Sequence, residues 1–157
     1  MKLKPGVICL IIVTLLSITV AMVVAGNDID EYRSCNYCGM DRKAYGYSRM
    51  MVNYENGSQV GVCSLHCAVT EMEGHKERAV RSILVADRTS HEMIDAKKAV
   101  WVIGGKKRGV MTQNPTWAFT TQAAAQSFVA TNGGTITSWD VVLPVAREDA
   151  MPTPRHR

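Results

Sequence analysis

The sequence predicts an α+β fold in which two tandem ββαβ units pack as one small domain, preceded by an N-terminal hydrophobic segment for export or anchoring. Three observations support this prediction. Short runs rich in Val, Ile, Trp and Tyr are typical of strands. Each half of the chain has one helix-like segment that ends in glycine. The order strand, strand, helix, strand occurs twice, and because neither half of about 45 residues would bury much core alone, we expect the halves to pack together.

The N-terminal segment predicts export. Basic MKLK precedes the apolar run 7–25, which is the arrangement of a signal peptide. The run is also just long enough to cross a bilayer, so residues 1–26 are either a cleaved signal or a retained membrane anchor. No cysteine ends the run, so the protein is not expected to be a lipoprotein. We therefore expect a periplasmic or otherwise extracytoplasmic protein, with residues 27–34 as a linker.

The first unit is predicted over residues 35–88, within a domain that covers residues 35–143. It opens with a tight cysteine knuckle that Gly39 closes. An Asn-Gly pair predicts a two-residue hairpin turn between its first two strands. Ser64 is expected to cap the helix, which ends at Gly74. The predicted strands cover residues 45–54, 59–63 and 82–87.

The second unit is predicted over residues 97–143 and lacks cysteines. Its helix, within residues 120–134, has a threonine cap and a glycine stop. A Pro-rich, charged tail over residues 144–157 is expected to be disordered. The predicted strands cover residues 99–104, 109–119 and 135–142.

Composition and charge exclude some classes of function. The chain is 46% hydrophobic and 20% charged, as ordinary globular domains are. Its formal net charge is +4, to which Lys2 and Lys4 contribute. A nucleic-acid-binding surface needs a concentrated basic stripe, and only GGKKRG at residues 104–109 approaches one. We interpret that hexapeptide as a solvated turn and expect no nucleic-acid partner.

Four cysteines outside the hydrophobic run form two close pairs. Cys35 and Cys38 are separated by two residues, and Cys63 and Cys67 by three, with a hairpin-length spacer between the pairs. The knuckle presents the first pair and the first helical turn presents the second on one face, so all four are expected at one metal. The helix N-terminus is expected to lower the pKa of the second pair.

Other interpretations of the cysteines remain open at this point. Structural disulfides suit an exported chain, although pairs this close in sequence close only small loops. A thioredoxin-type dithiol is disfavoured because its motif should open a helix, whereas a hairpin follows here. Four cysteines at these spacings also suit a closed tetrahedral Zn(II) site.

Two methionines favour copper over zinc. Met40 lies two residues after Cys38, and Met111 lies beside a loop in the second unit. Thioether together with thiolate selects soft Cu(I). His66 is a further candidate donor. The remaining methionines and histidines considered are interpreted as core or solvent-facing residues: Met50, Met51 and Met72 as core, and His75 and His91 as solvent-facing.

The chain resembles the NosL family, the copper-binding accessory proteins of nitrous oxide reductase. The matching segments, in order, are CNYCGM, VCS, MIDAKKAVWVIG, GVMTQNPTWAF and AAAQSFVATNGGTITSWDVV, which together run from Cys35 to Val142. The resemblance implies a monomer of two ββαβ units, similar in topology to part of the organomercurial lyases. It also implies one Cu(I) held outside the cytoplasm and passed on for metal-centre assembly in denitrification.

Carried over by position, the resemblance places metal-binding roles on Cys35 or Cys38, on Met40 and on Met111. The implied partner is a copper-receiving protein or membrane transporter. Two features depart from the family pattern. The lipidated cysteine is missing, so residues 7–25 would provide any attachment to the membrane. Cys67 and His66 add donors that would make a closed four-ligand site.

Three hypotheses follow from the sequence. The first is a non-enzymatic Cu(I) chaperone for nitrous oxide reductase or a similar copper enzyme. Its ligand pool comprises Cys35, Cys38, Met40, Cys63, Cys67 and Met111, with His66 as a further donor. The alternative is an exported interaction module with a structural four-cysteine Zn(II) site. The third is an enzyme that cleaves carbon–metal bonds with Asp41 as proton donor, although a turn role for Asp41 is the simpler interpretation.

Overall fold

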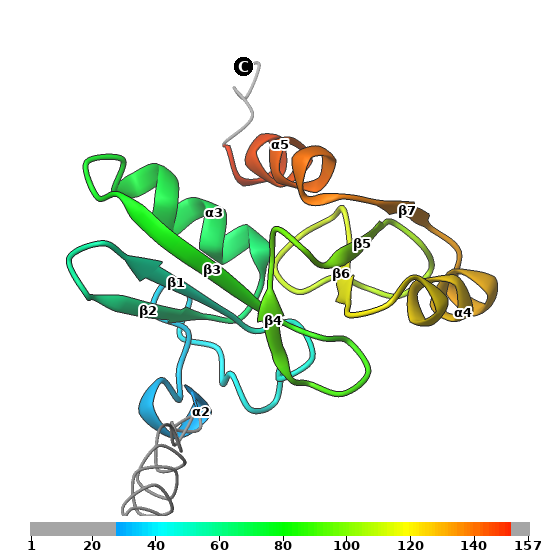
Figure 1. Cartoon of the computed structure of the whole chain (residues 1–157), viewed down its shortest axis with the longest axis horizontal. Coiled ribbons are helices and arrows are strands. Elements are labelled where there is room, and N and C mark those ends of the chain that lie inside the picture. The colour runs from blue at the N-terminus through cyan, green and yellow to red at the C-terminus, as the bar shows by residue number, and fades with distance from the viewer. Residues whose placement is uncertain (1–27, 152–157) are drawn as a thin grey trace, which may run out of the picture.

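The computed structural model describes residues 28–151, which form two antiparallel sheets with helices packed on them (Figure 1). The predicted hydrophobic segment lies outside these residues, and so does the end of the tail. None of the helices between residues 28 and 151 combines the length and the hydropathy needed to cross a bilayer. The two sheets and the helices packed on them confirm the α+β class. The N-terminal segment stays a prediction.

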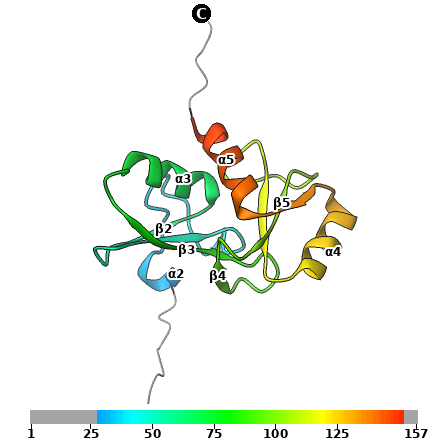
Figure 2. The same cartoon turned by 45° about the horizontal axis from the view of Figure 1, so that its top comes forward.

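The first sheet has four strands in the order β2-β1-β3-β4. Helix α3 (Leu65–Gly74) covers one face, and the short helix α2 (Asp28–Glu31) lies on the opposite side (Figure 2). Burial of Met50, Val52 and Tyr54 beneath the helix explains why this segment forms the central strand. The strands are β1 (Met50–Tyr54), β2 (Gln59–Val62), β3 (Val80–Ala86) and β4 (Met93–Asp95).

The second sheet has three strands in the order β6-β5-β7. Helix α4 (Gln122–Asn132) packs on it through Phe128 and Val129, and its predicted cap is confirmed because Thr121 accepts a hydrogen bond from the Ala124 N–H. The predicted glycine stop is confirmed at Gly133, which has a positive φ of 73°. The strands are β5 (Val100–Ile103), β6 (Thr116–Phe119) and β7 (Thr135–Thr137).

The C-terminal prediction was wrong. The closing strand ends at Thr137, and helix α5 (Trp139–Ala150) replaces both its second half and the first part of the predicted disordered tail. The helix forms because its buried side chains, Trp139, Val142 and Ala146, recur at helical spacing and pack against α3 and the Trp101 ring. Tertiary packing thus overrides the strand preference of a β-branched run.

Four smaller features also differ from those predicted. Residues 109–115 form a loop rather than a strand, and β4 was not expected. The hairpin loop between β1 and β2 spans residues 55–58, with Gly57 at a φ of 84°, rather than two residues. The predicted linker contains α2, which ion pairs attach to the domain. The strand–strand–helix–strand order does occur twice, while the grouping into two tandem units stays a prediction.

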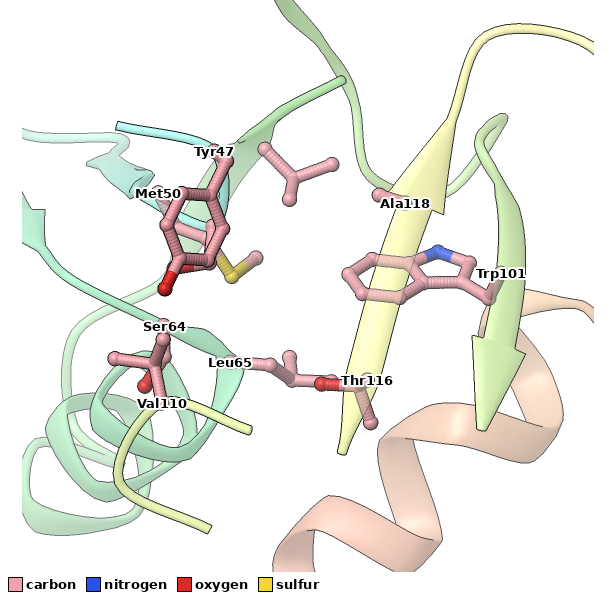
Figure 3. Close-up of a pocket in the computed structure, with 10 residues that line it drawn as sticks. Tyr47, Met50, Ser64, Leu65, Trp101, Val110, Thr116 and Ala118 are labelled. Carbon is pink, nitrogen blue, oxygen red and sulfur yellow. The ribbon is translucent and has the colours of Figure 1, made fainter. Parts of the chain in front are cut away.

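The two halves meet where Met50, Leu65 and Trp101 approach one another (Figure 3). They enclose a cavity of only about 10 Å³, which is room for roughly one water molecule. The interface is therefore well packed, and no ligand is expected there.

Candidate metal centre

Four sulfur atoms converge at one place in the first half of the domain. The Sγ atoms of Cys35, Cys38, Cys63 and Cys67 all lie within 4.8 Å of one another. The Sγ of Cys63 is 3.5 Å from that of Cys38 and 3.7 Å from that of Cys67. A disulfide needs about 2.05 Å, and all four cysteines are free thiols. The sequence prediction that two close pairs meet at one site therefore agrees with the geometry.

The first pair is carried by a small backbone hairpin. Cys35 donates its N–H to the Met40 carbonyl at 2.8 Å, and Gly39 donates to the Cys35 carbonyl at 2.9 Å. Gly39 has a φ of 77°, a conformation that costs glycine little. The Asn36 N–H reaches the Gly61 carbonyl of β2, so the knuckle is fixed to the strand that leads to Cys63.

A fully buried arginine joins this knuckle to the rest of the sheet. The Arg42 side chain is inaccessible to solvent, and its Nε donates to the Val62 carbonyl, next to Cys63, at 3.1 Å. Its other nitrogens donate to the carbonyls of Tyr32 and Met50 and to the Asp28 carbonyl and carboxylate. Arg42 therefore connects the knuckle that carries Cys35 and Cys38 to the strand that leads to Cys63.

The second pair comes from the end of β2 and the first turn of α3. Cys63 directly follows the strand, and its carbonyl accepts a hydrogen bond from the Ser48 hydroxyl at 2.8 Å. Ser64 occupies the N-cap position with an extended φ of −163°, but its side chain makes no cap hydrogen bond, so the predicted role of that hydroxyl was wrong. Cys67 lies one turn further along on the same helix face.

The thiols do not share their protons equally. Hydrogen bonds from the Cys63 and Cys67 thiols, with smaller effects from the backbone N–H groups of Cys38 and Tyr37, lower the pKa of Cys35. The hydrogen bond to Cys35 in turn raises the pKa of Cys63 to about 12, and the pKa of Cys67 also rises. The helix N-terminus was expected to lower the pKa of Cys63 and Cys67. This effect is outweighed by the hydrogen bonds that both thiols make to Cys35.

Access to the cluster differs among the four thiols. Cys35, Cys63 and Cys67 are buried, with 2% or less of each residue exposed, whereas Cys38 is half-buried. A molecule in solution would therefore reach the cluster first at Cys38.

The two predicted methionine donors have different surroundings. Met40 is half-buried and packs against the core cluster that contains Cys35, Cys63 and Cys67. Met111 is 43% exposed and has a φ of 60°, which is unusual for a residue with a side chain.

The loop that carries Met111 is fixed on both sides of that residue. Val110 is buried and lies beside Ser64, at the start of α3 (Figure 3). The Thr112 hydroxyl donates to Asp149 Oδ2 on α5 at 2.6 Å, and His66 Nδ1 on α3 is 3.5 Å from the same oxygen. The loop is therefore attached to the turn from which Cys63 and Cys67 project.

The remaining candidates lie outside the sulfur cluster. Among the described residues, His66 and Asp41 are not part of the group of candidate ligands. Asp41 accepts hydrogen bonds from the N–H groups of Ala44 and Lys43 and pairs with Arg33, and these contacts, that of Ala44 first, lower the pKa of its carboxyl. An ionised turn residue is poorly suited to donate a proton. The expectation for Met50, Met51 and Met72 is confirmed, because the first two are buried and Met72 packs against the core.

Sequence reasoning missed Arg42 and Asp149. A buried arginine gives no sequence signal of its own, because cations are usually exposed. Its position directly after the knuckle, with an aspartate upstream, was the only available indication. Asp149 fell within the residues predicted to be disordered.

Two of three comparisons with known proteins find matches. A model of the NosL family matches residues 26–145. The fold is similar to the crystal structure of the copper chaperone NosL from Shewanella denitrificans, with a TM-score of 0.57 and 20% sequence identity over 71% of this chain and 90% of that one. No curated protein matches the chain. At 20% identity the structural match establishes the fold.

Proposed function

The chain belongs to the NosL family, and from this premise we propose that it is a non-enzymatic metallochaperone that holds Cu(I) at its cysteine cluster outside the cytoplasm. The observation that carries the proposal is the convergence of four sulfur atoms within 4.8 Å. Thiolates are the ligands that soft Cu(I) prefers. The apolar run over residues 7–25 supports a location beyond the cytoplasmic membrane.

Delivery would proceed by ligand exchange at Cys38. Because this thiol alone among the four is half-buried, a sulfur or imidazole ligand of the recipient can approach the metal there while the buried thiols still hold it. Stepwise exchange keeps the ion bound throughout the transfer. We propose a copper-receiving protein as partner, nitrous oxide reductase or a similar copper enzyme, or a membrane transporter that serves it.

Met111 would supplement the cluster from the second half of the domain. Its neighbour Val110 lies beside Ser64. Its neighbour Thr112 hydrogen-bonds to Asp149 on α5, whose carboxylate is 3.5 Å from His66 of α3. The exposed thioether therefore lies in a loop that is connected to the cysteine-bearing turn on both sides. A thioether added to thiolates favours Cu(I) over Zn(II). Met40, packed against the same core cluster, is the second methionine of the proposed pool.

A structural Zn(II) site is the alternative, and the sulfur spacing favours it. Zn–S bonds of about 2.3 Å in a tetrahedron place sulfurs about 3.8 Å apart. The Cys38–Cys63 and Cys63–Cys67 separations are close to this value, and three of the four thiols are buried. A purely structural site would make the fold depend on the metal and leave both methionines without a role.

The two functions are separated by metal competition. Reduced full-length protein, kept anaerobic, is offered Cu(I) and Zn(II) together with a strong Cu(I) chelator, and the bound metal is identified by native mass spectrometry. A chaperone retains one Cu(I), and Met40→Leu or Met111→Leu weakens that retention. Met93→Leu on β4 is the matched control. Stoichiometric Zn(II) with no retained Cu(I) would overturn the copper proposal.

A further inference from the structure

One arginine in the loop after β3 lacks an acidic partner. The Arg88 guanidinium lies over the rings of Tyr47 and Trp117, 4.6 and 5.4 Å from their centroids. Within residues 28–151 its side chain makes no hydrogen bond or ion pair, and its Nε is buried. Only Nε is among the buried unpaired atoms, so the two terminal nitrogens stay accessible. A partly desolvated cation without an ion-pair partner is unfavourable, and a ligand that supplies acceptors to these terminal nitrogens would be stabilised there.

The neighbouring carboxylate of Asp87 forms no ion pair with Arg88. Asp87 accepts four hydrogen bonds, from the N–H groups of Thr89 and Ser90 and from the N–H and hydroxyl of Thr120. These bonds occupy both carboxylate oxygens and fix the loop on which Arg88 lies. The Arg88 N–H also donates to the Ala118 carbonyl at 2.8 Å, so the arginine is preorganised.

Arg88 borders an open cavity of about 600 Å³, a volume typical of small-molecule sites. Lys107 of the basic loop adds a second cation, and the half-buried Phe128 ring, which packs on the buried Phe119, provides an apolar wall. No acidic residue among those described lines the cavity. The lining therefore combines positive charge with aromatic surface.

The rim of this cavity contains a strained residue. His91 has a φ of 63°, in the left-handed region that favours glycine. Its N–H donates to the Asp87 carbonyl and its own carbonyl accepts from Arg49 at 2.9 Å, so the loop holds the residue in this conformation. Backbone strain that the surrounding structure maintains is concentrated at functional sites.

We propose that this cavity binds an organic acid, with its carboxylate on Arg88 and Lys107 and its apolar body against the Phe128 ring. A planar guanidinium matches a carboxylate through two parallel hydrogen bonds, and the aromatic wall selects against bare inorganic anions. The same chemistry is offered by a free aromatic or aliphatic acid and by the C-terminal residue of a peptide. The site is distinct from the cysteine cluster and does not depend on the metal.

The test is a titration of the ¹⁵N-labelled, reduced full-length chain, held in lipid nanodiscs because of its apolar N-terminal run. Three probes are compared: 3-phenylpropanoate, its neutral amide and inorganic phosphate. A fourth, N-acetylphenylalanine, represents a peptide C-terminus. We expect the two carboxylates to shift the amide signals of Thr89 and Ser127, whereas the amide and phosphate bind at least about tenfold more weakly.

Variants locate the binding. Arg88→Gln should lower affinity about tenfold or more, because a charge-assisted pair is lost. Lys107→Gln, on an exposed side chain that cannot unfold the domain, should lower it about two- to threefold. Arg81→Gln on the exposed side of β3 is the matched control and should change nothing. Equal binding of acid and amide, or unchanged affinity in both Arg88→Gln and Lys107→Gln, would refute the proposal.

Discussion

Replacement of Arg42 by methionine tests whether this arginine keeps the two cysteine-bearing segments in place. Methionine keeps an unbranched side chain of similar length but removes the charge and all the donors. The carbonyls of Val62 and Met50 then lose buried hydrogen bonds, and Asp28 loses one of its two cationic partners. The knuckle would also lose its connection to the strand end beside Cys63.

The expected magnitude follows from these contacts. An unsatisfied buried acceptor costs about 1–3 kcal/mol, and removal of one partner of a buried ion pair costs about 3–5 kcal/mol. The ion-pair contribution should be at its lower limit, because Arg49 still donates to the Asp28 carboxylate at 2.9 Å. These contributions overlap, so we expect a loss of about 4 kcal/mol in the free energy of unfolding, a large share of the 5–15 kcal/mol typical of a domain.

The measurement is urea unfolding of the reduced, metal-free protein, followed by circular dichroism. Arg81→Met, an exposed arginine on β3, is the control and should change stability by no more than about 0.5 kcal/mol. Affinity for the bound metal ion should fall in the Arg42 variant and remain unchanged in the control. A loss below about 1 kcal/mol for Arg42→Met would refute this account, because buried acceptors cannot go unsatisfied at so small a cost.

Three further predictions test other contacts. Gly61→Ala should destabilise the domain by about 1–3 kcal/mol in the same urea assay, because its new Cβ would lie 2.9 Å from Arg42 Cζ, and a neutral result would contradict this packing. In metal-free protein, mass spectrometry should find Cys38 alkylated before Cys67, and the reverse order would show that access differs from the structure. Burial alone would raise the pKa of Asp87, but its hydrogen bonds outweigh this and lower it from 3.8. The free energy of unfolding of the wild-type chain should therefore exceed that of Asp87→Asn by its full amount above about pH 5, and this difference should disappear as the pH falls through the lowered pKa of Asp87. A difference that does not depend on pH would refute this prediction.

The elements predicted well from sequence are those with strong local signals. The helix that begins after Thr121 and ends before Gly133 has a cap, a compatible interior and a stop. The pairing of Cys35 and Cys38 with Cys63 and Cys67 was also predictable, because turn and helix spacings place each pair before tertiary packing is considered.

Three of the failures share a cause, since each depends on contacts between distant segments. Helix α5 contains Pro144 and a β-branched run, and only packing of Trp139 and Val142 against the rest of the domain makes it helical. Arg42 is buried because acceptors from three separate segments surround it, which no local pattern encodes. The Met111 loop likewise depends on Asp149, far away in sequence.

The position of the cysteines along the chain has a consequence for the order of synthesis. All four lie between residues 35 and 67, in the half that leaves the ribosome first, whereas Met111 follows in the second half. Domains tend to fold from the N-terminal side during synthesis. A nascent chain would therefore present the four thiols and Met40 before the loop that carries Met111 exists. The moment at which metal is loaded would then help to decide which ion is captured, because the earlier donor set is richer in thiolate and the complete one adds a second thioether, which favours copper.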